Sequence, residues 1–225
     1  MNTSVQPKYD FAVIATDTVI FTIKDNELQV LLIQMKKKPF TDMWAMPGGL
    51  VKGDESVTNA AKRHLLDKTR IKNVYLEQLY TFGAVDRDPF GRVVSVAYFA
   101  LIPSANISLK TTKEYAGVQW FSVSDLPKMA YDHKKIVTLA VERLQAKLTY
   151  TNIVFSLLPD EFSLSELQNI YEVILGKKLD KRNFRKKILS LNLVKNTGKQ
   201  QLGSPNRPPE LYTFVKKQLE NVQIL

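Results

Sequence analysis

The chain has 225 residues, no cysteine, 44% hydrophobic and 24% charged residues, and a formal net charge of +10. This length can hold one large or two small domains, and the composition is that of a soluble globular protein. The absence of cysteine excludes disulfides and thiolate metal sites, which suits a reducing cytoplasm. No segment reaches the ~18 uncharged apolar residues of a membrane helix, and the first residues carry no secretory signal.

The first two thirds of the chain mix strand-like and helix-like patterns. Runs of apolar and β-branched residues predict strands at residues 11–21, 28–35, 74–82, 92–102 and 117–121. Apolar residues at helical spacing predict one helix around residues 57–65, with Asp54 as its N-cap, and another at 132–148. This mixture predicts an α/β/α sandwich as a first domain, over residues 1–149.

Residues 150–225 are organised differently. A short helix is expected at 153–158, and a second helix begins at the capping box formed by Ser163 and Glu166. A third helix is expected at 181–191, followed by two strands at 193–194 and 211–215 around a loop rich in glycine and proline. Helix, helix, turn, helix and hairpin is the order of a winged helix-turn-helix domain.

The third helix is strongly basic. Between residues 177 and 199 there are nine basic residues and one acidic residue, which leaves a local charge of 9 − 1 = +8. An apolar stripe faces inward on a helical wheel, and the opposite side suits a DNA major groove, where Arg pairs with guanine and Asn with adenine. The expected DNA-binding residues are Lys181, Arg182, Asn183, Arg185 and Lys186, with Arg207 in the wing. The alternative is an ordinary helical domain with a solvated basic face.

Residues 49–71 (GLVKGDESVTNAAKRHLLDKTRI) carry the spacing of a known motif, the Nudix box. Gly49, Glu55 and Arg63 occupy its fixed positions, and its two apolar positions are also filled. A Pro-Gly-Gly sequence leads into the stretch, so the chain resembles the Nudix family here. The resemblance implies the Nudix version of the α/β/α sandwich.

The departures from the box lie at its acidic positions, where His64, Asp67 and Lys68 replace glutamates. Positions three and four apart share one helix face, and in working Nudix hydrolases that face holds magnesium with carboxylates. A lysine placed there repels a cation by roughly 4 kcal/mol at an effective dielectric constant of about 20. We therefore expect no metal, no cofactor and no hydrolysis by the usual route, and a domain that binds a ligand instead.

A degenerate Nudix domain followed by a winged helix resembles the Nudix-related transcriptional regulators. Beyond the box, residues 82–101 and 180–187 also resemble that family. The resemblance implies a dimer whose Nudix domain senses a small effector and whose winged helix binds a double-stranded DNA operator. One branch of the family senses ADP-ribose and another senses sugars such as arabinose, and a damaged box occurs in both.

The effector site is expected around a polar loop. Arg87 and Arg92 suit a phosphate, and Asp86 and Asp88 suit sugar hydroxyls. The same residues also suit a salt-bridged turn that shapes the loop or passes the ligand state to the other domain. Trp44 suits stacking on a base, although a partly buried core tryptophan is the more common role.

Two rival functions remain open from the sequence. One is a Nudix hydrolase with residual or altered activity, which uses Glu55 and Asp67 with carboxylates from elsewhere in the chain. The other is an RNA-binding module that uses the same basic surface. His64 is a packed or hydrogen-bonded residue in our interpretation, rather than a metal ligand.

Overall fold

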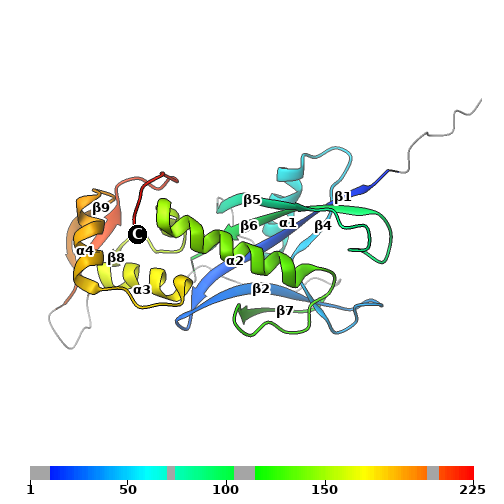
Figure 1. The fold of residues 1–225 in the computed structure, drawn as a ribbon, viewed down its shortest axis with the longest axis horizontal. Helices are drawn as coiled ribbons and strands as arrows, with labels where there is room; N and C mark the ends of the chain where they lie inside the picture. The colour runs from blue at the N-terminus through cyan, green and yellow to red at the C-terminus, as the bar shows by residue number, and fades with distance from the viewer. Residues whose placement is uncertain (1–10, 70–73, 104–114, 202–207) are drawn as a thin grey trace, which may run out of the picture.

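A computed structural model of the chain describes residues 11–69, 74–103, 115–201 and 208–225. Figure 1 shows an elongated molecule with a large sheet at one end and a small, mainly helical domain at the other. The long helix α2 (His133–Tyr150) runs from the first part to the second. No helix in the described ranges is long and apolar enough to cross a membrane.

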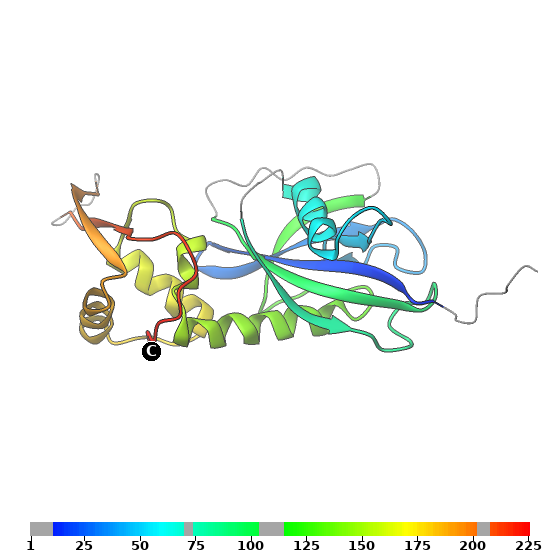
Figure 2. The ribbon, with the colours of Figure 1, turned by 90° about the horizontal axis from the view of Figure 1, so that it is seen from above.

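The large sheet lies between two helices, as Figure 2 shows, with α1 (Val57–Thr69) on one face and α2 on the other. Its strands are β1 (Val13–Lys24), β2 (Glu27–Met35), β3 (Trp44–Ala45), β4 (Gly48–Leu50), β5 (Tyr75–Phe82), β6 (Val93–Leu101) and β7 (Tyr115–Ser122). The order is β3-β2-β1-β6-β5, with β4 paired to β1 and β7 paired to β2. The predicted α/β/α sandwich is confirmed.

The central strand β1 is apolar on both of its faces because a helix covers each face. Val19 and Phe21 pack into the cluster that includes α2, whereas Ile20 packs into a second cluster with Leu65 of α1. β1 runs parallel to β6, so that Asp17 lies beside Ala97 in the middle of the sheet. Asp17 is thus a buried charge in an apolar strand.

The second domain has the predicted winged-helix order. Its elements are the 3-10 turn η2 (Ile153–Ser156), β8 (Phe162–Ser163), α3 (Leu164–Leu175), α4 (Lys181–Ser190), β9 (Val194–Gln200) and β10 (Glu210–Phe214). The capping box of Ser163 and Glu166 is present, and Gly176 ends α3 in the left-handed conformation at φ 66°. Asp180 caps α4 by accepting a hydrogen bond from the Asn183 backbone N–H at 2.8 Å.

Two local predictions were wrong, and one short strand was missed. Asp54 does not cap α1, because the helix begins at Val57 and the Ser56 hydroxyl accepts from the Asn59 N–H at 3.2 Å. The segment expected as a first helix is only the short turn η2, and the short strand β8 was not expected. A periodic pattern cannot reveal a strand as short as β8, and it does not distinguish one turn of 3-10 helix from a short α-helix.

The two halves share one apolar core. A single cluster of buried side chains extends from Val19 of β1 through Leu144 of α2 to Phe214 of β10. The C-terminal segment also returns to α2, where the Val222 and Ile224 N–H groups donate to the Tyr150 and Thr149 carbonyls at 2.8 and 2.9 Å. The domain boundary expected between residues 149 and 150 falls at the end of α2 and remains a prediction.

The capping box provides a test of the winged-helix fold. Ser163→Ala removes the side chain that accepts from the Glu166 N–H, so we expect the free energy of unfolding to fall by about 1 kcal/mol. Urea denaturation measures this loss. The matched control is Ser190→Ala, whose exposed hydroxyl lies at the end of α4. A loss no larger than that of the control would contradict the assigned cap.

Candidate functional site

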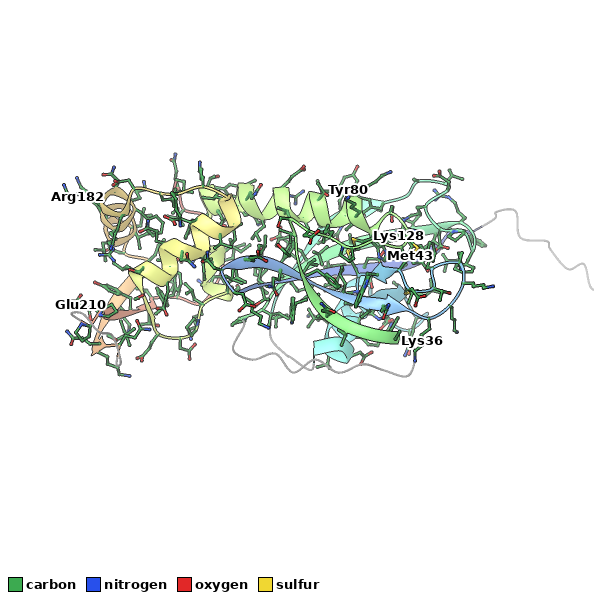
Figure 3. The ribbon with its side chains drawn as sticks, turned by 90° about the horizontal axis from the view of Figure 1, so that it is seen from below. Lys36, Met43, Tyr80, Lys128, Arg182 and Glu210 are labelled. Atoms are coloured by element: carbon green, nitrogen blue, oxygen red, sulfur yellow. The ribbon has the colours of Figure 1, made fainter. Side chains whose placement is uncertain are left out.

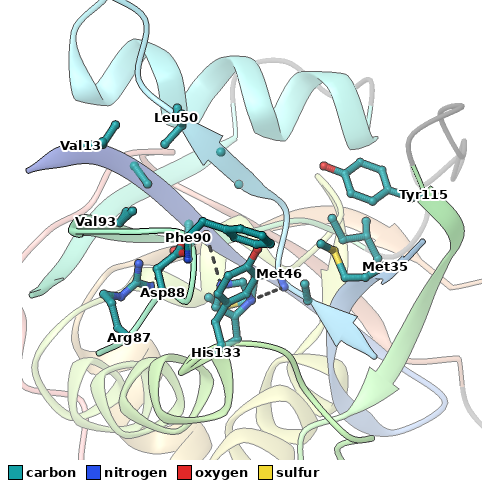
Figure 4. A pocket seen from close by; sticks show the side chains of 17 residues that line it. Val13, Met35, Met46, Leu50, Arg87, Asp88, Phe90, Val93, Tyr115 and His133 are labelled. Atoms are coloured by element: carbon teal, nitrogen blue, oxygen red, sulfur yellow. Dashed lines mark hydrogen bonds and ion pairs between the residues drawn. The ribbon is translucent and has the colours of Figure 1, made fainter. Parts of the chain in front are cut away.

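A pocket of about 410 Å³ opens beside the central strand at the end of the sheet far from the winged helix. It is walled by β1, β2, β4, the loop between β5 and β6, and the segment that leads into α2 (Figure 4). The lining residues that matter below are Asp17, Gly49, Arg87, Asp88, Phe90 and His133. Such a volume lies within the range of small-molecule sites.

A buried ionic network forms the floor of this pocket. The Arg87 guanidinium donates two hydrogen bonds to Asp132, from Nε to Oδ2 at 3.1 Å and from Nη2 to Oδ1 at 2.8 Å. Its Nη2 also lies 3.3 Å from Asp17 Oδ2, which accepts from the Ser95 hydroxyl at 2.6 Å. The network therefore connects β1, β6, the β5–β6 loop and the start of α2.

His133 completes the network. Its Nδ1 accepts a hydrogen bond from the Met46 backbone N–H at 3.0 Å, and its Nε2 lies 3.5 Å from Asp17 Oδ1 (Figure 4). A nitrogen that accepts cannot carry a proton, so the ring proton is on Nε2 and points toward Asp17. His133 thus connects the Asp17 carboxylate to the backbone of the pocket wall at Met46.

Asp17 remains ionised despite its burial. Burial by itself raises the pKa of a carboxyl, but the facing His133, the Ser95 hydroxyl and the Arg87 charge outweigh it and lower the pKa of Asp17 to about 2. Gly48 leaves room for this carboxylate, because a Cβ at that position would meet Asp17 Oδ1 and the Thr16 carbonyl. The floor of the pocket is therefore polar and held from several sides.

The mouth of the pocket is apolar and exposed. Val13, Leu50 and Phe90 line it with 46%, 57% and 69% of their surface exposed. In Figure 4 the Phe90 ring lies over the pocket, between Val93 and Met46. The pocket therefore has two chemically different parts, a charged floor and an apolar rim with one aromatic ring.

The structure separates the residues predicted for effector binding. Arg87 and Asp88, which are neighbours in one loop, both line the pocket, and their contact with an effector remains a prediction. The guanidinium of Arg87 is already paired, but with Asp132 and Asp17 rather than with the aspartates of its own turn. Arg92 lies outside the lining residues and donates to the Ala84 carbonyl at 3.2 Å, and Asp86 is exposed and also outside them.

Trp44 lies in β3 and packs into the core. Its ring is 4.6 Å from that of Phe121, edge to face, and it does not line the pocket. Sequence reasoning missed Asp17, His133 and Phe90. The signal for Asp17 was a single acid inside a strongly apolar strand, whereas nothing local marks His133 or Phe90.

The Nudix box supports a loop. Glu55 accepts from Arg63 Nε at 3.0 Å, pairs with a second guanidinium nitrogen of Arg63, and accepts from the Lys52 N–H at 3.0 Å. The hydrogen bond from Arg63, together with the Lys52 N–H, lowers the pKa of Glu55 to about 2. Arg63 also donates to the Leu50 carbonyl at 3.3 Å, so the pair holds the loop that forms one wall of the pocket.

His64 occupies the place of a metal-binding glutamate. A Cβ on Gly49 would lie 2.8 Å from its Cε1, so the imidazole packs directly against the backbone of the pocket wall. Burial and the nearby Arg63 charge lower the pKa of His64, which keeps it neutral. Asp67 is exposed in α1, and the side chain of Lys68 lies outside the described residues. Within the described residues, no cluster of three metal-ligating side chains occurs.

Helix α4 presents a basic face at the far end of the molecule, where Figure 3 labels Arg182. Phe184 and Ile188 are buried against the domain core, and Leu189 is 43% exposed. The residues exposed on the outer face are Lys181, Arg182, Asn183, Lys186 and Lys187. This pattern agrees with the predicted inner and outer faces.

Two of the predicted DNA contacts differ from the rest. Arg185 is half-buried and donates from Nη2 to the Ser165 hydroxyl at 2.9 Å, so it braces α4 against the start of α3. Arg207 lies outside the described residues. The exposed basic face of α4 therefore consists of its first turn, capped by Asp180, together with Lys186 and Lys187.

The ionised state of Asp17 predicts a dependence of stability on pH. Its pKa is lowered from an ordinary 3.8 to about 2 on folding, so its stabilisation is complete above pH ~4 and is lost as the pH falls toward 2. Between pH ~4 and ~2 the unfolding free energy of Asp17→Asn should therefore fall by about 2 kcal/mol less than that of the unmodified chain.

Denaturant titrations at several pH values in this window measure the difference between the two proteins. Other carboxyls such as Glu55 titrate equally in both and cancel. The control Asp125→Asn changes an exposed aspartate in the turn before α2. Parallel pH profiles for Asp17→Asn and the unmodified chain would show that Asp17 is not held as described.

Both halves of the chain match known protein families. Residues 15–140 match the NUDIX domain, and residues 154–214 match the NrtR DNA-binding winged helix domain. A relative from Acinetobacter baylyi, described as "ADPR responsive transcriptional repressor NtrR", is 37% identical over 210 residues, which are 92% of this chain and 83% of that protein.

Solved structures agree with this placement. Shewanella oneidensis NrtR complexed with a 27mer DNA is 34% identical, with a TM-score of 0.80 over 91% of this chain and 94% of that one. The NUDIX domain of the same protein complexed with ADP ribose is 34% identical, with a TM-score of 0.56 over 63% of this chain and 94% of that one. The resemblance to Nudix-related regulators is confirmed, and the chain belongs to the NrtR family, in which a Nudix domain is joined to a winged helix.

Proposed function

We propose that this chain is a DNA-binding transcriptional repressor that responds to ADP-ribose. Its Nudix domain senses the ligand without cutting it, and its winged helix binds an operator. The main observation that supports this function is a pocket with an ordered, charged floor beside a Nudix box that lacks its usual set of carboxylates. The names of the relatives in Acinetobacter baylyi and Shewanella oneidensis support the same reading.

The chemistry of the pocket suits a nucleotide sugar. An adenine base has a π face that stacks on an exposed aromatic ring, and Phe90 offers such a ring at the apolar mouth. Ribose hydroxyls donate to carboxylates, and Asp88 lies on the lining. The diphosphate needs a cation, and Arg87 is the cation among the described lining residues. A free pentose has neither base nor phosphate and leaves the mouth of the pocket unused.

Loss of hydrolysis is part of the proposal. Magnesium requires several oxygen ligands in octahedral geometry, and here the key helix position holds a neutral imidazole. Glu55, the box carboxylate nearest to the loop, is fully engaged by Arg63 and the Lys52 N–H. Asp67 alone does not make a metal site. The domain therefore keeps the ligand whole, as a sensor requires.

The DNA-binding half follows from the basic face of α4. Its first turn places Arg182 and Asn183 outward, with lysines on either side for phosphates. Winged helices commonly bind as pairs on operators with two half-sites, and we propose that this chain acts as a cytoplasmic homodimer. The simpler alternative is a solvated basic surface that binds no DNA. The DNA experiment below distinguishes the two.

Ligand binding is tested by calorimetry and thermal shift with ADP-ribose. We expect a stabilisation of about 2.7 kcal/mol at one hundred times the Kd, with the same value in magnesium and in EDTA. Phe90→Ala should weaken binding about tenfold, or 1.4 kcal/mol, because a stacking surface is lost. The matched control is Val85→Ala, an exposed apolar residue of the same loop that does not line the pocket.

Three outcomes would change the proposal. Binding of L-arabinose or xylose instead of ADP-ribose would assign the chain to sugar regulation. Stabilisation only with metal, together with release of AMP, would make it a hydrolase. Equal ADP-ribose affinities of Phe90→Ala and the unmodified chain would show that the adenine base does not stack on Phe90 at the mouth of the pocket.

DNA binding is tested on a duplex that the protein itself selects from a random-sequence pool. Arg182→Ala should weaken binding to the selected duplex by about 1–3 kcal/mol and relax its preference at one base position. Lys62→Ala, an exposed lysine on α1, serves as the control. Affinity that does not change in Arg182→Ala, or a preference for RNA over the duplex, would refute the placement of the recognition face.

A further inference from the structure

The start of helix α2 carries an aspartate that does not cap it. Asp132 is the N-cap residue of α2, and aspartate is among the best residues for that position. Within the described structure its carboxylate makes no cap hydrogen bond. Both of its oxygens instead accept from Arg87, at 2.8 and 3.1 Å. Arg87 thus competes with the first turn of α2 for one carboxylate.

The backbone at this position is strained. Tyr131, the residue before Asp132, has a φ of 52°, which is unfavourable for a bulky side chain. Asp132 itself has φ −91° and ψ 15°, outside the extended region that an N-cap normally adopts. Strain of this kind persists where the surroundings hold it, and here Arg87 and the packing of Tyr131 between Phe40 and His133 do so. These contacts hold the segment in the conformation observed.

The same segment lies at the pocket and also leads into α2, the helix that runs to the other domain. Tyr131, Arg87 and His133 line the pocket, and His133 is the first residue of α2. Figure 2 shows α2 running from there to the winged helix. At its far end Lys147 pairs with Glu77 at 2.9 Å, and Gln145 donates to the Ile174 carbonyl of α3 at 2.9 Å. A change at the start of α2 reaches α3 through one rigid element.

We propose that Asp132 is exchanged between two partners, and that this exchange is how ligand binding reaches the winged helix. In the free protein Asp132 pairs with Arg87. When a ligand phosphate binds Arg87, the carboxylate is released, relaxes the backbone at Tyr131 and caps α2 at the Lys134 N–H, whereas the Lys135 N–H already donates to the Asp132 carbonyl at 2.9 Å. The inference rests on the proposed function, since it requires an anionic ligand in this pocket.

Both charged groups, Arg87 and Asp132, have a partner in each of the two states. A phosphate offers Arg87 the same two-pronged acceptor geometry as a carboxylate, and Asp17 remains beside the guanidinium in both states. Asp132 loses one cation and gains backbone donors at a helix N-terminus, where a negative charge is favoured. Neither state leaves a buried charge alone. Two states of similar free energy are what a ligand can shift.

Asp132→Asn separates the two partners. Asparagine caps a helix as well as aspartate does, but it has no charge to hold Arg87. The variant should resemble the ligand-bound state before any ligand is present. We expect ADP-ribose to bind about three- to tenfold more tightly. By reciprocity of the coupling, the factor by which ADP-ribose changes DNA affinity should fall to less than about a third of its original value.

Calorimetry with ADP-ribose and titration of the selected duplex with and without ADP-ribose measure the two quantities on the full chain. Asp125→Asn is the matched control and should change neither. Unchanged ADP-ribose affinity and an unchanged coupling factor in Asp132→Asn would overturn the exchange. Weaker ADP-ribose binding with an unchanged coupling factor would also overturn it, because Asp132 would then only position Arg87.

Hydrogen exchange on the unmodified chain gives a readout that does not depend on a folded variant. We expect the Lys134 amide to become at least several-fold better protected when ADP-ribose is bound. No change in its protection, in a protein that binds ADP-ribose, would refute the exchange while leaving the proposed function intact. Absence of ADP-ribose binding altogether would refute the proposed function first, and the exchange with it.

Discussion

The buried pairing of Arg87 with Asp17 and Asp132 is the constraint on which the rest of the sensor half depends. Removing three charges from water is expensive, and it is tolerated only where each charge finds partners with good geometry. Here those partners come from β1, β6, the β5–β6 loop and the start of α2, so the pocket has its shape only when all four are in place. The charge network therefore specifies the position of the elements more than it stabilises them.

The Nudix box has a different physical role in this chain from the one it has in a hydrolase. The Glu55–Arg63 pair closes the loop before α1, and His64 supports the pocket wall behind Gly49. Both interactions preserve the shape of the pocket without assembling a metal site. In the described residues the box thus supports the loop and the pocket wall, and the positive charge of the pocket floor belongs to the Arg87 side chain.

Sequence reasoning predicted the architecture well because its signals are local. The strands, the capping box at Ser163 and the cap at Asp180 each follow from residue types within a few positions of one another. The box departures and the basic face of α4 were visible for the same reason. Asp54 was a wrong cap because Ser56, two residues later, competes for the same N–H groups.

The pocket could be predicted only in part, because its floor is built from residues far apart in the chain. Arg87 and Asp88 were found as a polar loop, but the partners of Arg87, Asp17 and Asp132, lie 70 and 45 positions away from it. No spacing rule connects such positions. Trp44 shows the opposite error, since its place beside the Pro-Gly-Gly sequence suggested a ligand contact whereas its ring packs on Phe121.

The apolar core that runs from Val19 to Phe214 has a thermodynamic consequence for the molecule as a whole. Elements that share one core tend to unfold together, so the sensor and the winged helix form a single cooperative unit. Any molecule that binds only the folded chain then raises one common melting temperature, whichever end it occupies. A melting curve for this chain therefore reports that something binds, and the end of the molecule that binds it has to be located by a spatially resolved method.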